Sequence, residues 1–233
     1  EPFHAVVEFA ILASKRHPFD PMELAMQRLG LETLQQTEHL HPQWGMVREY
    51  ELQPRFLAMT RVWESEPAAA GEGYVLAAKG APEAIIDLCH LPPLQSQAIE
   101  AAVGTMAARG LRVIGVARGR TQSEALPPIQ HDLDFTFVGL IGLADPLRAE
   151  AAAAIAECRQ AGIAVAMITG DYAATAQAIG RAAGLESPGG VLSGPELATL
   201  DDQALAERVK EVRIFARILP EQKLRRVEAL KRG

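Results

Sequence analysis

The sequence predicts two domains of different class, an α+β domain over residues 1–142 and an α/β domain over residues 143–233. In the first part, short strand-like runs follow one another through polar or Pro/Gly linkers, which is typical of an antiparallel meander. Further along the chain, continuous apolar runs alternate with helical patterns, which is typical of a parallel sheet covered on both faces. A chain of 233 residues is long enough for two ordinary domains.

The first domain combines strand patterns with helices that precede and interrupt them. Strands are expected over residues 45–52, 56–65, 73–80 and 111–119, and helices over 21–29, 82–88 and 96–109. The first of these helices has a clear start signal, with Asp20 as N-cap, Pro21 at the first position and Glu23 three residues after Asp20. This capping-box-like start explains Glu23 without any ligand.

The second part of the chain alternates strands and helices. Strands are expected over residues 135–144, 163–168, 190–194 and 212–218, and helices over 147–162, 172–184, 197–209 and 220–233. Asp201 is expected to be a further N-cap. Because ligands of such sheets bind beyond the carboxyl ends of the parallel strands, that edge is the expected site.

Composition argues against several functions. The chain has 23 basic and 29 acidic residues and a net charge of −6, which disfavours nucleic-acid binding. Cys89 and Cys158 are isolated, which favours a reduced compartment. No apolar run is long enough to cross a bilayer, and the start lacks a Met and a basic segment, so we expect a processed product or an excised fragment. We expect no metal site, because no cluster completes the pair His39-x-His41.

The most suggestive stretch is Thr169-Gly170-Asp171, which follows an apolar run and precedes a helix of small residues. Gly170 lets a ligand approach the backbone closely, free amides at a helix start attract anions, and the Thr169 hydroxyl can donate to a phosphate oxygen. The alternative is a tight turn at Gly170 with Asp171 as N-cap. Taken alone, the tripeptide favours this alternative.

A second candidate is the stretch LAAKGAPE, residues 76–83. Lys79 ends an apolar strand, Gly80 follows, and Pro82 begins a helix. Lys79 would reach into the cleft that the strand end faces. The alternative is a solvated lysine at the end of a strand, with an ordinary strand-to-helix turn after it.

A third candidate is the stretch FARILPEQK, residues 215–223, in which Arg217 ends a strand and Lys223 lies in the next helix. Both could point toward the same carboxyl-end crevice as Thr169, where two cations would favour a phosphate. The alternative places Lys223 on a solvated helix face. The sequence Asp132-x-Asp134-x-Thr136 mimics the nucleophile motif of haloacid-dehalogenase-type phosphatases, but it precedes an apolar strand and would lie at the wrong end of it.

These stretches occur in one order that is similar to a known family. KGAPE, DPLR (residues 145–148), TGD and FARILPEQK, together with FDPMELA, EYELQPRFLAMT and ARGLRVIGVA, are arranged as in the cation-transporting P-type ATPases, or E1-E2 ATPases. The resemblance covers nearly the whole chain and is nearest to the calcium-pump-like branch in its bacterial form. The hinge reads D-P-L-R where the family usually has D-P-P-R. The stretch from Tyr50 to Met59 is longer than in animal calcium pumps, so Arg55 is given no role.

The resemblance implies a nucleotide-binding domain inserted into a haloacid-dehalogenase-like, Rossmann-like phosphorylation domain. Tyr50 would stack on adenine, Met59 would line the pocket, Lys79 and Gly80 would close it, and Glu23 would lie near the adenine as well as in the cap. The other residues that it implies are Arg112 and Arg217 for the nucleotide, Thr169, Gly170, Asp171 and Lys223 for the phosphoryl group and its magnesium side, and Asp145 and Arg148 for the hinge.

The resemblance also implies a parent protein that couples ATP hydrolysis, through an aspartyl-phosphate, to cation transport. The family's D-K-T-G-T and G-D-G-x-N-D strings are absent from the 233 residues, so the chain is expected to bind ATP or ADP without turnover, with the main Mg²⁺ ligands outside it. The expected partners are the actuator and transmembrane domains, at the cytoplasmic face of a bacterial plasma membrane. The alternatives are a free-standing dehalogenase-type phosphatase and a non-enzymatic nucleotide-binding module.

Overall fold

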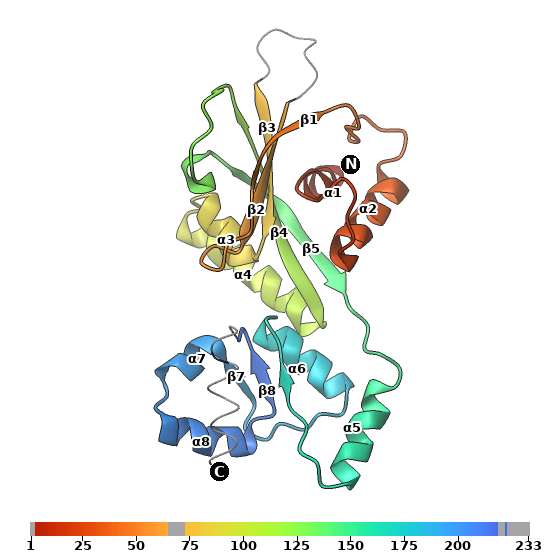
Figure 1. Cartoon of the computed structure of the whole chain (residues 1–233), viewed down its shortest axis with the longest axis vertical. Helices are drawn as coiled ribbons and strands as arrows, with labels where there is room; N and C mark the ends of the chain where they lie inside the picture. Colours follow the sequence, from red (N-terminus) through yellow and green to blue (C-terminus); the bar gives the residue numbers. More distant parts are fainter. Residues whose placement is uncertain (1–2, 65–72, 219–221, 223–233) are drawn as a thin grey trace. The chain divides into compact units, whose positions relative to one another are not determined.

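The computed structural model describes residues 3–64, 73–218 and 222, and these divide into two compact units (Figure 1). The first unit comprises Glu1–Val103 and Val113–Leu143, and the second comprises Gly104–Arg112 and Ala144–Gly233. The sequence predicts the join between residues 142 and 143. Assigning the two units to a nucleotide-binding and a phosphorylation domain remains a prediction.

A five-stranded sheet with the order β1-β2-β3-β4-β5 forms the centre of the first unit. Its strands are β1 (Gly45–Tyr50), β2 (Ala58–Glu64), β3 (Tyr74–Gly80), β4 (Leu111–Thr121) and β5 (Thr136–Ala144). The pairs β1–β2, β2–β3 and β3–β4 are antiparallel, so the predicted meander is confirmed. The expected strand over 135–144 is formed as well, but it joins this antiparallel sheet next to β4 and not the parallel one.

Helices cover both faces of this sheet. The helices of the first part of the chain are α1 (His4–Leu12), α2 (Pro21–Thr33), α3 (Pro82–Leu88) and α4 (Pro93–Ala108), and a short 3-10 turn spans Gln130–Asp132. Figure 1 shows α1 and α2 on one side of the sheet and α3 on the other. The sequence patterns did not predict α1, because its stretch HAVVEFAIL is apolar on nearly every side and therefore lacks the periodicity of a surface helix.

Register assigns side chains to the two faces, because residues directly opposite one another in an antiparallel pair lie on the same face. Tyr50 is opposite Thr60, and Thr60 is opposite Ala78, so these three share one face. Met59 is opposite Lys79 and lies on the other face. The Lys79 face packs against α1 and α2, where the core includes Phe9, Met26, Trp63, Val75 and Val116.

The second unit contains a small parallel sheet with the order β6-β8-β7. Its strands are β6 (Met167–Ile168), β7 (Val191–Ser193) and β8 (Ile214–Ala216), and its helices are α5 (Ala151–Gln160), α6 (Ala173–Ala182), α7 (Gly194–Thr199) and α8 (Asp202–Glu211). Parallel pairing of β6 and β7 with β8 confirms the expected sheet type. The strands are shorter than predicted, and that expected over residues 163–168 is formed only at its last two residues.

Of the three aspartates considered as N-caps, two fill that role. The Asp20 carboxylate accepts hydrogen bonds from the backbone N–H groups of Met22 and Glu23, at 2.9 and 3.2 Å, and Asp201 caps α8 through the N–H of Ala204. Asp171 is not an N-cap, because α6 begins two residues later and Tyr172 is its N-cap residue. The expected helix over 220–233 lies outside the described residues except for Gln222. Within the described ranges, none of the helices has both the length and the apolar character that a membrane crossing requires.

Gly80 offers a test of this packing. A Cβ atom at residue 80 would collide with the carbonyl oxygen of Leu57 and with Ala58, whereas one at Gly45 would have no atom within 4 Å. Because the obstacle at residue 80 is largely backbone, we expect Gly80→Ala to lower the free energy of unfolding by about 1–3 kcal/mol. Gly45→Ala should change it by less than about 1 kcal/mol. Urea denaturation of both variants measures this, and equal effects would contradict the close approach at Gly80.

Candidate functional site

Lys79 is a buried lysine at the end of β3, with 7% of its surface exposed. Its Nζ atom donates to Oε1 of Glu23 at 2.6 Å and to Oγ of Ser14 at 2.7 Å. Glu23 and Ser14 are buried too, at 8% and 1% exposed. The alternative of a solvated lysine at a strand end is therefore wrong, and Lys79 and Glu23, which the sequence predicted for one pocket, are in direct contact.

The partners of Lys79 are themselves held in place. Ser14 follows the C-terminal end of α1, and its hydroxyl donates to the carbonyl oxygen of Ala10 at 2.7 Å. Glu23 lies in the first turn of α2, and its second oxygen accepts from the backbone N–H of Lys15 at 3.3 Å. The Glu23 carboxylate thus binds the Lys79 ammonium and the backbone N–H of Lys15. These contacts, and not the contact with the N-cap backbone that a capping box would form, hold the side chain.

A second ion pair, between a buried arginine and a partly exposed glutamate, lies on the same face of the sheet. Arg61 of β2 is 2% exposed, and its Nη2 atom donates to Oε1 of Glu49 on β1 at 2.7 Å. Its Nε atom has no hydrogen-bond partner among the described residues. Burial lowers the pKa of Lys79, the contact with Glu23 opposes that shift, and the positive charge of Arg61 adds to it.

The structure does not bring Tyr50 together with Lys79. Tyr50 is buried on the opposite face of the sheet, where it packs with Val62, Leu76 and Leu133. Its hydroxyl donates to the carbonyl oxygen of Pro127 at 2.7 Å, and burial raises its pKa. The expectation of one pocket formed by Tyr50 and Lys79 is therefore not met, since the sheet separates the two side chains.

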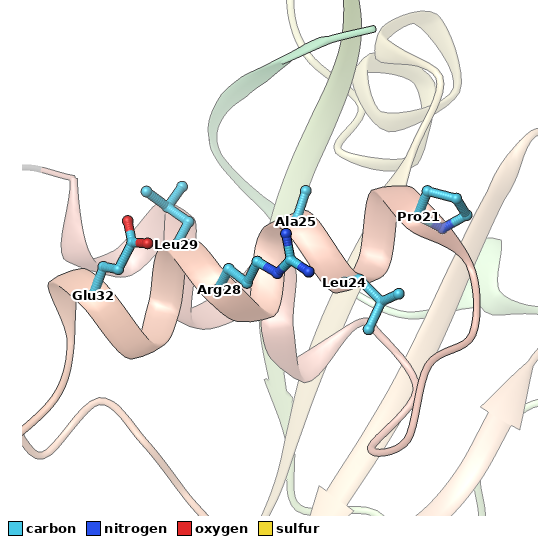
Figure 2. A pocket seen from close by; sticks show the side chains of 6 residues that line it. All are labelled: Pro21, Leu24, Ala25, Arg28, Leu29 and Glu32. Carbon is cyan, nitrogen blue, oxygen red and sulfur yellow. The ribbon is translucent and has the colours of Figure 1, made fainter.

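Met59 and Gly80 lie beside Lys79. Met59 is half-buried and directly opposite Lys79 on the same face. Gly80 is needed by the fold, because a side chain there would meet the Leu57 backbone. Pro82 begins α3 as predicted. A pocket of about 320 Å³ lies on the exposed side of α2 (Figure 2). None of the predicted site residues lines it.

In the second unit, Thr169 and Asp171 form a closed loop just after β6. The Thr169 hydroxyl donates to Oδ2 of Asp171 at 2.8 Å and accepts from the Asp171 backbone N–H at 3.0 Å. Gly170 between them is exposed, and a Cβ atom on it would meet nothing within 4 Å. Neither a positive φ nor close packing within the chain requires glycine at this position.

Arg217 lies beside this loop, directly after β8. Its backbone N–H donates to the carbonyl oxygen of Asp171 at 3.1 Å, and its guanidinium carbon is 4.6 Å from the centre of the Tyr172 ring. Its φ of 56° is unusual for a residue other than glycine. Desolvation lowers the pKa of Arg217. Arg112, in the segment grouped with this unit, has its Nε atom 3.7 Å from Oδ1 of Asp171.

Among the remaining predicted residues, those that the structure describes do not join either cluster. Lys223 lies outside the described residues. Asp145 and Arg148 are exposed and follow β5, next to the division between the units after Leu143. Asp132 and Asp134 precede β5, and Thr136 is its first residue, so the D-x-D-x-T sequence lies at the amino end of that strand, as expected.

The histidine pair has a partner that the sequence did not indicate. Nδ1 of His39 and Nε2 of His41 each lie 2.7 Å from an oxygen of Glu8 on α1. Within the ranges that the structure describes, no group of three or more His, Cys, Asp or Glu side chains is arranged to hold a metal ion. The contacts of His39 and His41 with Glu8 connect the segment after α2 to α1.

The fold thus defines a class of two-unit proteins in which an antiparallel α+β unit is followed by a unit with a small parallel sheet. Residues 18–150, more than half of the 233-residue chain, match the family model of the P-type ATPase cytoplasmic domain N. The chain belongs to this family.

Curated relatives agree with this family. The chain is 41% identical over 178 residues to the probable cation-transporting ATPase F of Mycobacterium tuberculosis, covering 69% of the chain and 19% of that protein. It is 37% identical over 177 residues to the cation-transporting ATPase pma1 of Synechocystis, with the same two coverages. It is 42% identical over 149 residues to the calcium-transporting ATPase 1 of Saccharomyces cerevisiae, covering 61% of the chain and 16% of that protein. The chain therefore spans less than a fifth of the length of these relatives.

The lowered pKa of Lys79 predicts a pH dependence of stability. The unfolded chain holds the Lys79 proton up to about pH 10.5, whereas the folded chain releases it at lower pH. Between these two pKa values the unfolded state binds more protons, so the contribution of Lys79 to the free energy of unfolding rises with pH. We expect denaturation at pH 8 to 10.5 to give a more positive slope for the natural chain than for Lys79→Met. Equal slopes would contradict the shift.

Proposed function

We propose that this chain is the ATP-binding cytoplasmic region of a P-type pump that couples ATP hydrolysis, through an aspartyl-phosphate, to cation transport. The observation that carries the proposal is the buried contact of Lys79 with Glu23 within the family-matched residues. The relatives named as cation-transporting ATPases support the transport role. The remaining partners would be the actuator and transmembrane domains, at the cytoplasmic face of a bacterial membrane.

The chemistry of the Lys79 cluster suits an adenine ring. Adenine presents ring nitrogens that accept hydrogen bonds and an exocyclic amino group that donates them. Lys79 supplies a donor, Glu23 supplies an acceptor, and the thioether of Met59 on the same face supplies a soft apolar surface. Tyr50 is left out of this proposed pocket because it faces the other side of the sheet and serves the core there.

The Thr169–Asp171 loop suits the phosphoryl end. It follows a parallel strand at its carboxyl end, where ligands of such sheets bind. Gly170 is exposed and needed by neither conformation nor packing, which leaves room for a ligand oxygen against the backbone. Arg217 beside the loop, and Lys223 beyond the described residues, would balance phosphate charge.

Mg²⁺ would be bound on the Asp171 side of this loop. Carboxylate and hydroxyl oxygens are the ligands that Mg²⁺ takes, and it usually keeps several waters and substrate phosphates as well. Asp171 and Thr169 supply oxygens of this kind. The principal protein ligands would come from the family's G-D-G-x-N-D segment, which the 233 residues do not contain. Asp145 and Arg148 would form the hinge between the two domains.

Nucleotide titration followed by two-dimensional NMR tests the pocket. We expect ATP to shift the resonances of Met59, Lys79 and Glu23 and their neighbours, because these groups share one face of the sheet. Lys79→Ala should weaken binding by about tenfold or more, since it removes a hydrogen bond to a charged group worth about 1.5–3 kcal/mol.

Lys15→Ala is the matched control, because Lys15 is exposed on the chain next to the cluster. It removes the same charge without touching the buried contact, so its ATP affinity should stay close to that of the natural chain. Shifts confined to Thr169 and its neighbours, with no effect of Lys79→Ala, would contradict the proposed pocket.

A phosphate-release assay tests the expected lack of turnover. The family's phosphorylated aspartate lies in D-K-T-G-T, which is absent from this sequence, so we expect no release of phosphate from ATP above the buffer rate. Thr169→Val serves as the comparison, because it removes the hydroxyl that would contact phosphate while keeping the side-chain shape. Release by the natural chain that disappears in Thr169→Val would favour the phosphatase alternative.

A further inference from the structure

Arg61 has no role in the function proposed above, and its surroundings are unusual. It is 2% exposed, yet it carries a positive charge and has an Nε atom with no hydrogen-bond partner among the described residues. Its partner Glu49 has 25% of its side chain exposed, and an ion pair in contact with water contributes little to stability. Its unpartnered Nε adds a further desolvation cost. Stability alone therefore does not account for Arg61.

Register puts Arg61 diagonally next to Lys79. Arg61 is directly opposite Ala77 on β3, and Lys79 follows two residues later on the same face. Such diagonal neighbours are about 7–8 Å apart at their Cα atoms, within the reach of long side chains. The side chain directly opposite Arg61, Ala77, is small, and the one directly opposite Lys79 is Met59. Because like charges repel, the positive charge of Arg61 contributes to the lowered pKa of Lys79.

We propose that Arg61 is a positioning residue of the Lys79 site, whose guanidinium repels the Lys79 ammonium and holds it against Ser14 and Glu23. On the other side of Arg61, Glu49 binds the guanidinium at 2.7 Å and keeps it at the β1 side of the face. The charged groups around Lys79 are Glu23 and Asp20 from α2 and its cap, Arg61 from β2, and the exposed Arg118 of β4, which is directly opposite Ala77 on the same face. This inference takes one element from the proposed function, namely that Lys79 contacts the nucleotide.

The consequence of this arrangement is a pair of opposite effects on the proton of Lys79. Arg61→Met removes a neighbouring positive charge, so the pKa of Lys79 should rise. Glu49→Gln removes the negative charge that partly compensates Arg61, so the pKa of Lys79 should fall. Arg61→Lys keeps the charge and should leave the pKa near its natural value.

The test is an NMR titration of the Lys79 side-chain Cε–Hε signal between pH 8 and 11, on the full chain without nucleotide. The signal is identified by its absence in Lys79→Arg. The proposal is supported if the pKa of Lys79 rises in Arg61→Met, falls in Glu49→Gln and does not change in Arg61→Lys. Loosened packing would instead shift this pKa in the same direction in all three variants. An unchanged pKa in both Arg61→Met and Glu49→Gln overturns it. If Arg61→Met does not fold, the Glu49→Gln titration alone decides.

ATP titration of the same variants at pH 8 and pH 10 links the effect to the site. The loss of ATP affinity between these pH values should be smaller in Arg61→Met than in the natural chain, because Lys79 keeps its proton to higher pH. If no variant binds ATP at either pH, the proposed function fails while the Lys79 titration still decides the role of Arg61. If ATP binds and Arg61→Met loses affinity with pH just as the natural chain does, the positioning role is overturned.

Discussion

The first unit depends on one buried ion pair, Lys79 with Glu23. A charged group inside a protein must be paired, because an unpaired buried charge costs several kcal/mol. Pairing requires the end of β3, the first turn of α2 and the chain after α1 to meet at one point, where Ser14 completes the contact. The entry angle of α2 is thereby set by the sheet, while Asp20 satisfies the helix's own free N–H groups.

Much of the fold could be predicted where local chemistry and packing agree. The helix over 82–88 has the predicted bounds because Pro82 presets its first turn, and the meander follows from strand patterns joined by short linkers. The strand over 135–144 was assigned to the alternating part of the sequence, yet it pairs next to β4. An apolar strand looks the same whichever sheet it joins, so only the tertiary contacts decide between the two.

The candidate site was only partly accessible from the sequence. Lys79 stood out by its place at the end of an apolar strand, and the resemblance added Glu23. Ser14 and Arg61 have no local signal and depend on α1 and on register. The resemblance put Tyr50 in one pocket with Lys79, and the sequence does not indicate which face of the sheet Tyr50 occupies. Side chains alternate along a strand, but the count cannot be carried across the irregular segment 51–57, where a single bridge joins Gln53 and Phe56. Pairing of Tyr50 with Thr60 and not with Met59 reverses its face.

The two clusters differ in burial and in what fixes their polar groups. Around Lys79 the polar groups are dry and bound to one another, so a ligand must replace each contact with an equivalent one, and such sites reject molecules that lack the matching donor or acceptor. Around Gly170 the loop is exposed, and its shape is fixed by the Thr169–Asp171 contacts and not by a helix cap. Exposed oxygen and nitrogen groups with a nearby cation bind charge more than shape. The proposed function accordingly assigns selectivity for the base to the first cluster and charge balance at the phosphoryl group to the second.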